Sequence, residues 1–302
     1  MKNSKRFQSR FLDPESLALL SPLSLVARAV VEGFLAGPHR GPFRGRSAEF
    51  REYSPYTPGD DARYVDWRVY ARTDRYYVRR FEEETDLSCY ILLDTSASMA
   101  YRPGALSKID YARFLAASLG HLITGQGDRV SLLSVSDRIK RALPPGGGPR
   151  HFRSFLHHLD AASAEGRSDL KAVLLRIAGG FARKGIIILI SDLYDDPRGV
   201  VRSLARLRRA GHEVIVFHLV DVSEVELQFD GAVEFEDLET GERVALDTRR
   251  ERGLYARRMK DMISFYSGAL SKEGIDFVGL DTSRPIDHAL LAYLRRRGRR
   301  RL

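Results

Sequence analysis

The feature that most constrains the fold is a regular alternation, from residue 87 onward, of short aliphatic runs with longer segments of helical spacing. Runs such as 89–93 and 186–190 are apolar at every position, which is typical of strands buried on both faces. Strands that are separated by helices usually pair in parallel and are covered by those helices. The sequence therefore predicts an α/β fold with a doubly wound, mostly parallel sheet.

The same patterns locate the individual elements. Strands are expected over 89–93, 129–135, 139–143 (at an edge), 186–190, 213–220 and 275–280. Helices are expected over 108–124, 151–159, 169–181, 200–210, 255–270 and 286–297. Between them, alternating apolar residues around a Glu-Thr-Gly turn predict a small β-hairpin insertion at about 222–250.

The first 86 residues have a different character. Helical spacing over 16–34 is followed by a stretch, 37–87, that is rich in proline, aromatic and charged residues. These features favour extended segments and turns over helix. We therefore expect an N-terminal extension over 1–86 and one α/β domain over 87–302, which contains the hairpin insertion.

Aspartates mark the ends of several expected strands, and these are Asp94, Asp192, Asp221 and Asp281. Binding sites of parallel sheets form at the carboxyl ends of the strands, although an aspartate there also commonly caps the next helix. For Asp94 and Asp192 the neighbouring hydroxyls favour a binding site, because Ser96 and Ser98 follow Asp94 and Ser191 precedes Asp192. Hard cations such as Mg²⁺ prefer oxygen ligands of this kind. The sequence thus predicts a divalent-metal site at Asp94.

The run Asp-Thr-Ser-Ala-Ser from Asp94 to Ser98 resembles the metal-ion-dependent adhesion site (MIDAS) of von Willebrand factor A-type domains. The resemblance implies two more ligands, a loop hydroxyl and an aspartate after a later strand. Ser168 and Asp192 stand in these places, with serine where the family usually has threonine. A serine hydroxyl rotates more freely, which affects affinity. The implied site holds Mg²⁺ or Mn²⁺ through Asp94, Ser96, Ser98, Ser168 and Asp192.

The N-terminal extension carries a second resemblance. The segment 45–61, Gly-Arg-Ser-Ala-Glu-Phe-Arg-Glu-Tyr-Ser-Pro-Tyr-Thr-Pro-Gly-Asp-Asp, and the following Tyr-Val-Asp-Trp of 64–67 are similar to a signature of a bacterial family known as domain of unknown function fifty-eight. Together with the part of the chain that carries the predicted metal site, the resemblance covers about residues 40–290. The aromatic and charged residues of the signature either pack the extension against the sheet or form a ligand site of their own.

This family is often found with MoxR-type AAA+ ATPases. The resemblance implies a non-enzymatic, metal-dependent protein-binding adaptor that works with such an ATPase in the assembly or maturation of other proteins. Its partners would be the ATPase and a client protein that offers an acidic residue to the ion. Many members carry two membrane helices before the signature; this chain shows none, so it resembles the soluble branch.

Cysteine usage and hydropathy are consistent with the cytoplasm. Cys89 is the single cysteine and lies inside an apolar run, so an internal disulfide is excluded and a small buried hydrophobe is expected. The longest purely aliphatic run, 186–190, is far shorter than the ~20 residues of a membrane-spanning helix. The N-terminus lacks the apolar core of a signal peptide. We expect a cytoplasmic protein.

Enzymatic activity is the main alternative. A haloacid-dehalogenase-type, Mg²⁺-dependent phosphatase also uses an aspartate after its first apolar strand, but it needs a second aspartate two residues later as general acid. Here that position is Ser96. The sequence also has no P-loop and no Gly-x-Ser-x-Gly elbow. We therefore expect no enzymatic activity.

The basic C-terminus is the other alternative. The net charge is +9, but residues 295–302 hold six arginines, and without them the balance is 9 − 6 = +3. Such a tail could bind the phosphates of a nucleic acid or of a membrane surface. Because no aromatic platform lies beside the arginines, we expect no specific nucleic-acid binding and at most weak membrane-surface contact.

Overall fold

The computed structural model describes residues 22–36, 53–55, 67–79, 87–102, 104, 106–181, 183–227 and 231–299. At its centre is a six-stranded sheet with the strand order β10-β7-β6-β3-β4-β5. These strands are β3 (Ser88–Asp94), β4 (Arg129–Val135), β5 (Ile139–Gly146), β6 (Gly185–Ser191), β7 (Glu213–Val220) and β10 (Asp276–Asp281). All neighbours pair in parallel except β4 with β5, so β5 is an antiparallel edge strand.

The sheet changes winding direction between β3 and β6. In chain order, β3 is the first of the six strands and lies between the second, β4, and the fourth, β6. A sheet wound in this way has a switch point at its first strand, where the connections leave toward opposite faces and a crevice opens at the carboxyl ends. The doubly wound, mostly parallel sheet expected from the sequence is confirmed.

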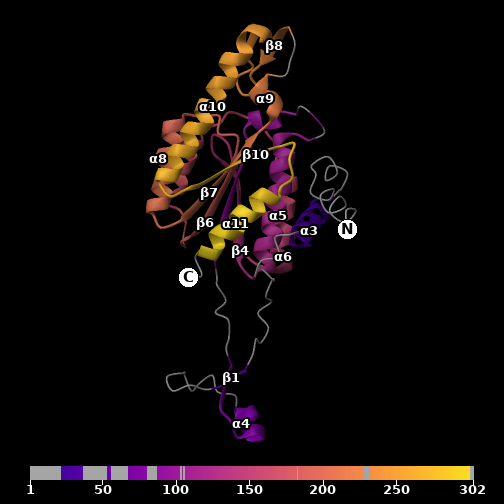
Figure 1. Cartoon of the computed structure of the whole chain (residues 1–302), viewed down its shortest axis with the longest axis vertical. Helices are drawn as coiled ribbons and strands as arrows, with labels where there is room; N and C mark the ends of the chain where they lie inside the picture. Colours follow the sequence, from indigo (N-terminus) through magenta and orange to yellow (C-terminus); the bar gives the residue numbers. More distant parts are fainter. Residues whose placement is uncertain are drawn as a thin grey trace.

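Two hydrophobic cores lie on the two faces of the sheet. One contains side chains of α3 (Leu23–Ala36), α5 (Lys108–Gly125), α6 (Gly148–Asp160) and α11 (Asp287–Arg299). The other contains side chains of α7 (Leu170–Ile177), α8 (Pro197–Arg209) and α10 (Thr248–Lys272). Figure 1 shows the sheet between these two helix layers. Alternate strand residues enter opposite cores, as a pleated sheet requires; Ile91 faces the first and Leu92 the second.

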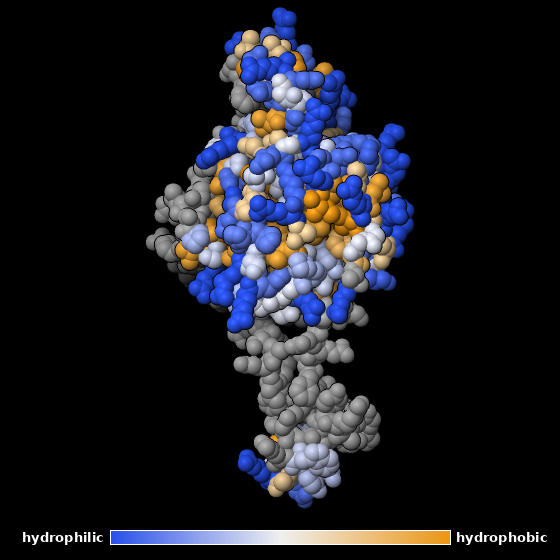
Figure 2. Space-filling view, turned by 180° about the vertical axis from the view of Figure 1, so that it is seen from behind, coloured by the Kyte–Doolittle hydropathy of each residue, from blue (hydrophilic) through white to orange (hydrophobic). Residues whose placement is uncertain are grey.

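The hairpin insertion lies between β7 and α10. It comprises α9 (Val222–Glu226), β8 (Ala232–Glu236) and β9 (Arg243–Asp247), and β8 pairs antiparallel with β9. The helix predicted over 255–270 begins earlier than expected, because Asp247 accepts a hydrogen bond from the N–H of Arg249 and caps α10 at Thr248. The end of the molecule that carries the hairpin is largely hydrophilic (Figure 2).

The signature region is described only in part. β1 (Tyr53–Pro55) pairs antiparallel with β2 (Tyr77–Arg79), and α4 (Trp67–Thr73) lies between them in the chain. The signature residues 45–52 and 56–66 lie outside the described residues. The ring of Trp67 makes edge contacts with Tyr70 and Tyr76 and remains 61% exposed.

The arginine-rich end of the chain includes a structural residue. Arg296, on α11, is 8% exposed and forms ion pairs with Glu213 at 3.0 Å and Asp276 at 3.3 Å. This side chain anchors α11 to the ends of β7 and β10. None of the described helices, α11 included, is long and apolar enough to cross a membrane.

Helix α3 belongs to the core of the α/β domain. Its apolar face, formed by Val26, Ala27, Val30 and Phe34, is buried in the first core and packs against α5. Part of the N-terminal extension thus shares its hydrophobic core with the sheet. The boundary at residue 86 stays a prediction.

Truncation of Phe34 tests this packing. Phe34 is 2% exposed, so Phe34→Ala should lower the free energy of unfolding by about 3–5 kcal/mol, the usual cost of a large cavity. Leu35, its neighbour on α3, is 38% exposed and provides a matched control; Leu35→Ala should cost about 1 kcal/mol or less. Urea denaturation followed by circular dichroism gives both values, and equal losses would show that α3 is not part of the core.

Candidate metal centre

Asp94 is held at the carboxyl end of β3 by its neighbours on both sides. The residue is fully buried. The N–H of Ser96 donates to its Oδ1 at 2.9 Å, and the hydroxyl of Ser191 donates to its Oδ2 at 2.5 Å. Thr95, the next residue, donates through its N–H and its hydroxyl to the carbonyl of Val135 at the end of β4. The carboxylate therefore has a fixed orientation at the switch point of the sheet.

A row of oxygens leads from the loop after β3 to Asp192. The Oγ atoms of Ser96 and Ser98 are 3.0 Å apart, and Ser98 donates its hydroxyl to Oδ1 of Asp192 at 3.3 Å. The short 3₁₀ helix η2 (Ala97–Ala100) turns the chain so that both hydroxyls face the same side. In an octahedral complex with bonds of ~2.1 Å, neighbouring ligand oxygens are about 3.0 Å apart. The three oxygens thus have the spacing of adjacent ligands.

Ser168 comes from a loop that is joined to this one by backbone hydrogen bonds. The N–H of Ala97 donates to the carbonyl of Gly166 at 2.8 Å, and the N–H of Glu165 donates to the carbonyl of Thr95 at 2.9 Å. Asp169 caps α7 by accepting from the N–H of Ala172 at 3.1 Å. The Oγ of Ser168 is buried, and no described residue forms a hydrogen bond with it. A buried polar atom without a partner costs about 1–3 kcal/mol, so this hydroxyl fits the role of a metal ligand.

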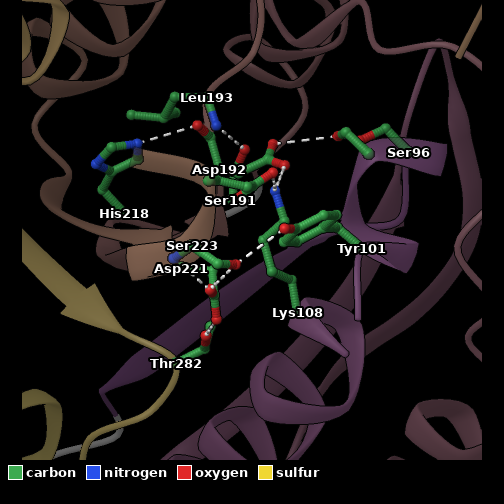
Figure 3. Close-up of polar contacts among 12 residues, drawn as sticks. Ser96, Tyr101, Lys108, Ser191, Asp192, Leu193, His218, Asp221, Ser223 and Thr282 are labelled. Atoms are coloured by element: carbon green, nitrogen blue, oxygen red, sulfur yellow. Dashed lines mark hydrogen bonds and ion pairs between the residues drawn. The ribbon is translucent and has the colours of Figure 1, made fainter. Parts of the chain in front are cut away.

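Lys108 is the functional residue that the sequence did not reveal. Its side chain is completely buried, and its Nζ donates to Asp192 Oδ2 at 2.7 Å and to Glu224 Oε1 at 2.8 Å (Figure 3). The rings of Tyr101 and Tyr194 lie 5.6 and 5.0 Å from the same nitrogen. Burial opposes the charged form, but the two carboxylates outweigh it and raise the pKa of Lys108. The ammonium group is a permanent cation beside Asp192.

The two aspartates create an excess of negative charge. Burial, and then the charge of Asp192, raise the pKa of Asp94 to about 7. Lys108 makes its ion pairs with Asp192 and Glu224, whereas Asp94 accepts hydrogen bonds and interacts electrostatically with Lys140. A divalent cation bound by both aspartates would neutralise this charge. Because every candidate donor is a hard oxygen, the residues fit Mg²⁺ or Mn²⁺.

Carboxylates alone would not identify this site. The described residues contain no group of three or more histidine, cysteine, aspartate or glutamate side chains with the spacing of a metal site. The predicted ligands are instead two carboxylates and three hydroxyls. The structure joins Asp94, Ser96, Ser98 and Asp192 in one hydrogen-bonded set, and it brings in Ser168 through the connection between the two loops.

The base of the site is rigid. His218, on β7, bonds through Nε2 to the carbonyl of Asp192 at 3.0 Å, and burial lowers the pKa of this imidazole to about 4. The ring is therefore neutral at physiological pH, and Nε2 carries the proton that it donates to the carbonyl. Ser191 also accepts the N–H of Leu193 at 2.9 Å (Figure 3). These bonds fix the backbone that carries Asp192.

The other two strand-end aspartates have structural roles. Asp221 accepts hydrogen bonds from the N–H of Ser223 at 2.9 Å and from the hydroxyl of Thr282 at 2.6 Å. Asp281 accepts from the N–H of Ser283 at 2.9 Å. Asp221 thus caps α9, the alternative that the sequence offered, whereas Asp281 closes a turn ahead of α11; both residues lie outside the oxygen row.

Fold and site together define an α/β protein with a row of carboxylate and hydroxyl oxygens at the switch point of its sheet. Residues 51–262 match the family model described as "Protein of unknown function DUF58", and the chain belongs to this family.

Several relatives and solved structures are similar to the chain. The uncharacterized protein Rv1480 of Mycobacterium tuberculosis is 32% identical over 232 residues, which cover 76% of this chain and 73% of that protein. The uncharacterized protein YeaD of Bacillus subtilis is 26% identical over 110 residues, which cover 36% of this chain and 25% of that protein. The crystal structure of BatB from Bacteroides thetaiotaomicron aligns with 70% of this chain and 99% of its own at 15% identity, with a TM-score of 0.48. The VWA domain of SpRpn10 aligns with 68% of this chain and 93% of its own at 13% identity, with a TM-score of 0.40.

Replacement of Lys108 tests the charge balance at the site. Lys108→Met leaves Asp192 and Glu224 buried without their cation, so the free energy of unfolding in EDTA should fall by about 3–5 kcal/mol. Adding Glu224→Gln to this variant should recover part of the loss, because one of the two uncompensated charges is removed. Lys260, an exposed lysine on α10, provides the control. If Lys108→Met costs no more than Lys260→Met in the same urea titration, Lys108 does not compensate the site.

Proposed function

We propose that this chain is a non-enzymatic adaptor that binds Mg²⁺ or Mn²⁺ and, through the ion, a carboxylate of a partner protein. The observation that carries the proposal is the set of converging oxygens at Asp94, Ser96, Ser98 and Asp192, together with the unpaired buried hydroxyl of Ser168. An ion held there would act as a Lewis acid toward an external oxygen ligand. The chain's own residues position the ion and balance its charge.

An external carboxylate is the ligand that such an ion would bind best. The candidate set offers five residues, and several of their oxygens also take part in hydrogen bonds within the protein, as those of Asp94 do. Mg²⁺ requires six ligands in octahedral geometry, so at least one position is left for water or for a partner. An anionic oxygen gains more from a divalent cation than water does. The partner surface should therefore present an aspartate or a glutamate.

We further propose a MoxR-type AAA+ ATPase as a partner, with a client protein as the source of the acidic residue. The support is the resemblance of the signature region to a family associated with such ATPases. A single, buried cysteine, Cys89, agrees with a cytoplasmic location.

The geometry of Asp94 favours binding over phosphatase chemistry. A nucleophilic aspartate needs an accessible oxygen, whereas Asp94 is fully buried and both of its oxygens accept hydrogen bonds. Two residues later, Ser96 stands where the general acid would be required. The burial and ion pairing of Arg296 likewise support a structural role for part of the basic end.

Mg²⁺-dependent capture of the ATPase tests the proposal. Wild-type protein on beads should retain a MoxR-type ATPase in Mg²⁺ and release it in EDTA, and Asp94→Ala should retain none, because the central ligand is missing. Asp281→Ala is the matched control, since Asp281 also ends a strand but bonds only within its own turn in the described contacts. Quantitative mass spectrometry of the eluates measures retention. Equal recovery with wild type and Asp94→Ala, or recovery unaffected by EDTA, contradicts the proposal.

A further inference from the structure

The turn of the hairpin insertion places one carboxylate against the candidate metal site. Glu239 lies between β8 and β9, and its Oε2 accepts a hydrogen bond from the backbone N–H of Ser168 at 2.9 Å. Ser168 is the loop ligand of the proposed site. Although the two residues are 71 positions apart in the chain, the hairpin brings a glutamate to the loop where a partner's carboxylate is expected.

The turn that presents Glu239 is well defined. The carboxylate of Asp237 accepts from the N–H of Glu239 at 2.7 Å and from the N–H of Thr240 at 3.3 Å. Gly241 has a φ of +73°, which favours glycine, and its N–H donates to the carbonyl of Asp237 at 2.7 Å. The N–H of Glu239 lowers the pKa of Asp237. The hydrogen bond from Ser168 to Glu239 shows that the turn faces the loop 166–168.

Two buried oxygens at this contact have no hydrogen-bond partner. They are Glu239 Oε1 and Ser168 Oγ, and no described residue forms a hydrogen bond with either. A buried carboxylate oxygen without a partner is more costly than a neutral one. A cation bound by both atoms would remove both costs. The hydrogen bond between Glu239 Oε2 and the N–H of Ser168 does not remove them, because it uses neither of the two unpaired atoms.

The remainder of the hairpin buries little side-chain surface, and at its base the hydroxyl of Thr248 donates to the carbonyl of Gly231 at 3.0 Å. The residues of β8 and β9 are exposed or half-buried, and none of them is fully buried. Its position therefore depends on polar contacts such as that of Glu239. A second acid from the same insertion, Glu224 of α9, reaches the site from another direction through its ion pair with Lys108, which also binds Asp192.

We propose that Glu239 is an internal ligand of the metal ion, which takes the coordination position that a partner's carboxylate must occupy. This inference rests on the proposed metal-dependent function. In the resting protein the hairpin closes the site with its own acid, and a partner binds by displacing Glu239. The insertion thereby sets a threshold: an incoming acidic segment must compete with a carboxylate that is already in place.

Mn²⁺ binding to the full chain tests the inference directly. Electron paramagnetic resonance of free Mn²⁺ gives the affinity, and water-proton relaxation gives the number of water molecules on the bound ion. Glu239→Ala should add at least one bound water and weaken Mn²⁺ binding by about tenfold. Glu239→Gln, which preserves shape but removes the charge, should weaken binding in the same direction. Glu242→Gln is the control, because Glu242 follows the same turn with an exposed side chain.

The outcomes separate this inference from the proposed function. If Asp94→Ala abolishes Mn²⁺ binding while Glu239→Ala matches wild type in affinity and water count, the metal site stands and the internal ligand is refuted. If wild type itself binds Mn²⁺ no better than Asp94→Ala, both are refuted. At saturating Mg²⁺, Glu239→Ala should also retain more of the acidic client protein, and of the ATPase bound with it, than wild type does; equal or lower retention would show that Glu239 does not compete with the partner's carboxylate.

Discussion

The parallel pairing of β3 with β6 is the constraint on which the site depends. Every residue of both strands is buried, and their register sets Leu93 opposite Ile190. At the last residue of each strand, the hydroxyl of Ser191 donates to the carboxylate of Asp94. Beyond these residues, the connections from β3 and β6 leave the sheet toward opposite faces. A shift in register would move the aliphatic side chains into the wrong cores. The packing of the sheet therefore fixes the positions of the carboxylates, and the site needs no separate scaffold.

Bringing two carboxylates into a buried crevice creates an electrostatic cost that the fold offsets in part. Lys108 enters from the first turn of α5 and compensates Asp192 and Glu224. Asp94 accepts two hydrogen bonds and interacts electrostatically with Lys140, whose ammonium donates to the carbonyl of Thr95. Burial nevertheless raises the pKa of Asp94, so its charge is only partly compensated. A divalent ion with oxygen ligands would supply the further positive charge.

The sequence predicted what depends on local patterns and missed what depends on distant contacts. Buried aliphatic strands are continuous in the chain, so the sheet and the positions of Asp94 and Asp192 could be read from it. Lys108 could not, because a lysine in the first turn of a helix ordinarily lies in solvent, and its burial follows from acids 84 and 116 residues away. Glu239 lies in an exposed, polar hairpin whose contact with Ser168 has no local signal. The share of α3 in the core was hidden for the same reason.

The insertion and the sheet contribute to the site in different ways. The sheet supplies proposed ligands whose places are fixed by hydrophobic burial, and these would change little whether or not a partner is bound. The insertion supplies Glu239 from a segment with little buried apolar surface, held to Ser168 by one hydrogen bond among the described contacts. Such a contact exchanges readily when another carboxylate arrives. An ion in the rigid part would therefore bind in a defined place, while the choice of its last ligand stays open to competition between the hairpin and a partner.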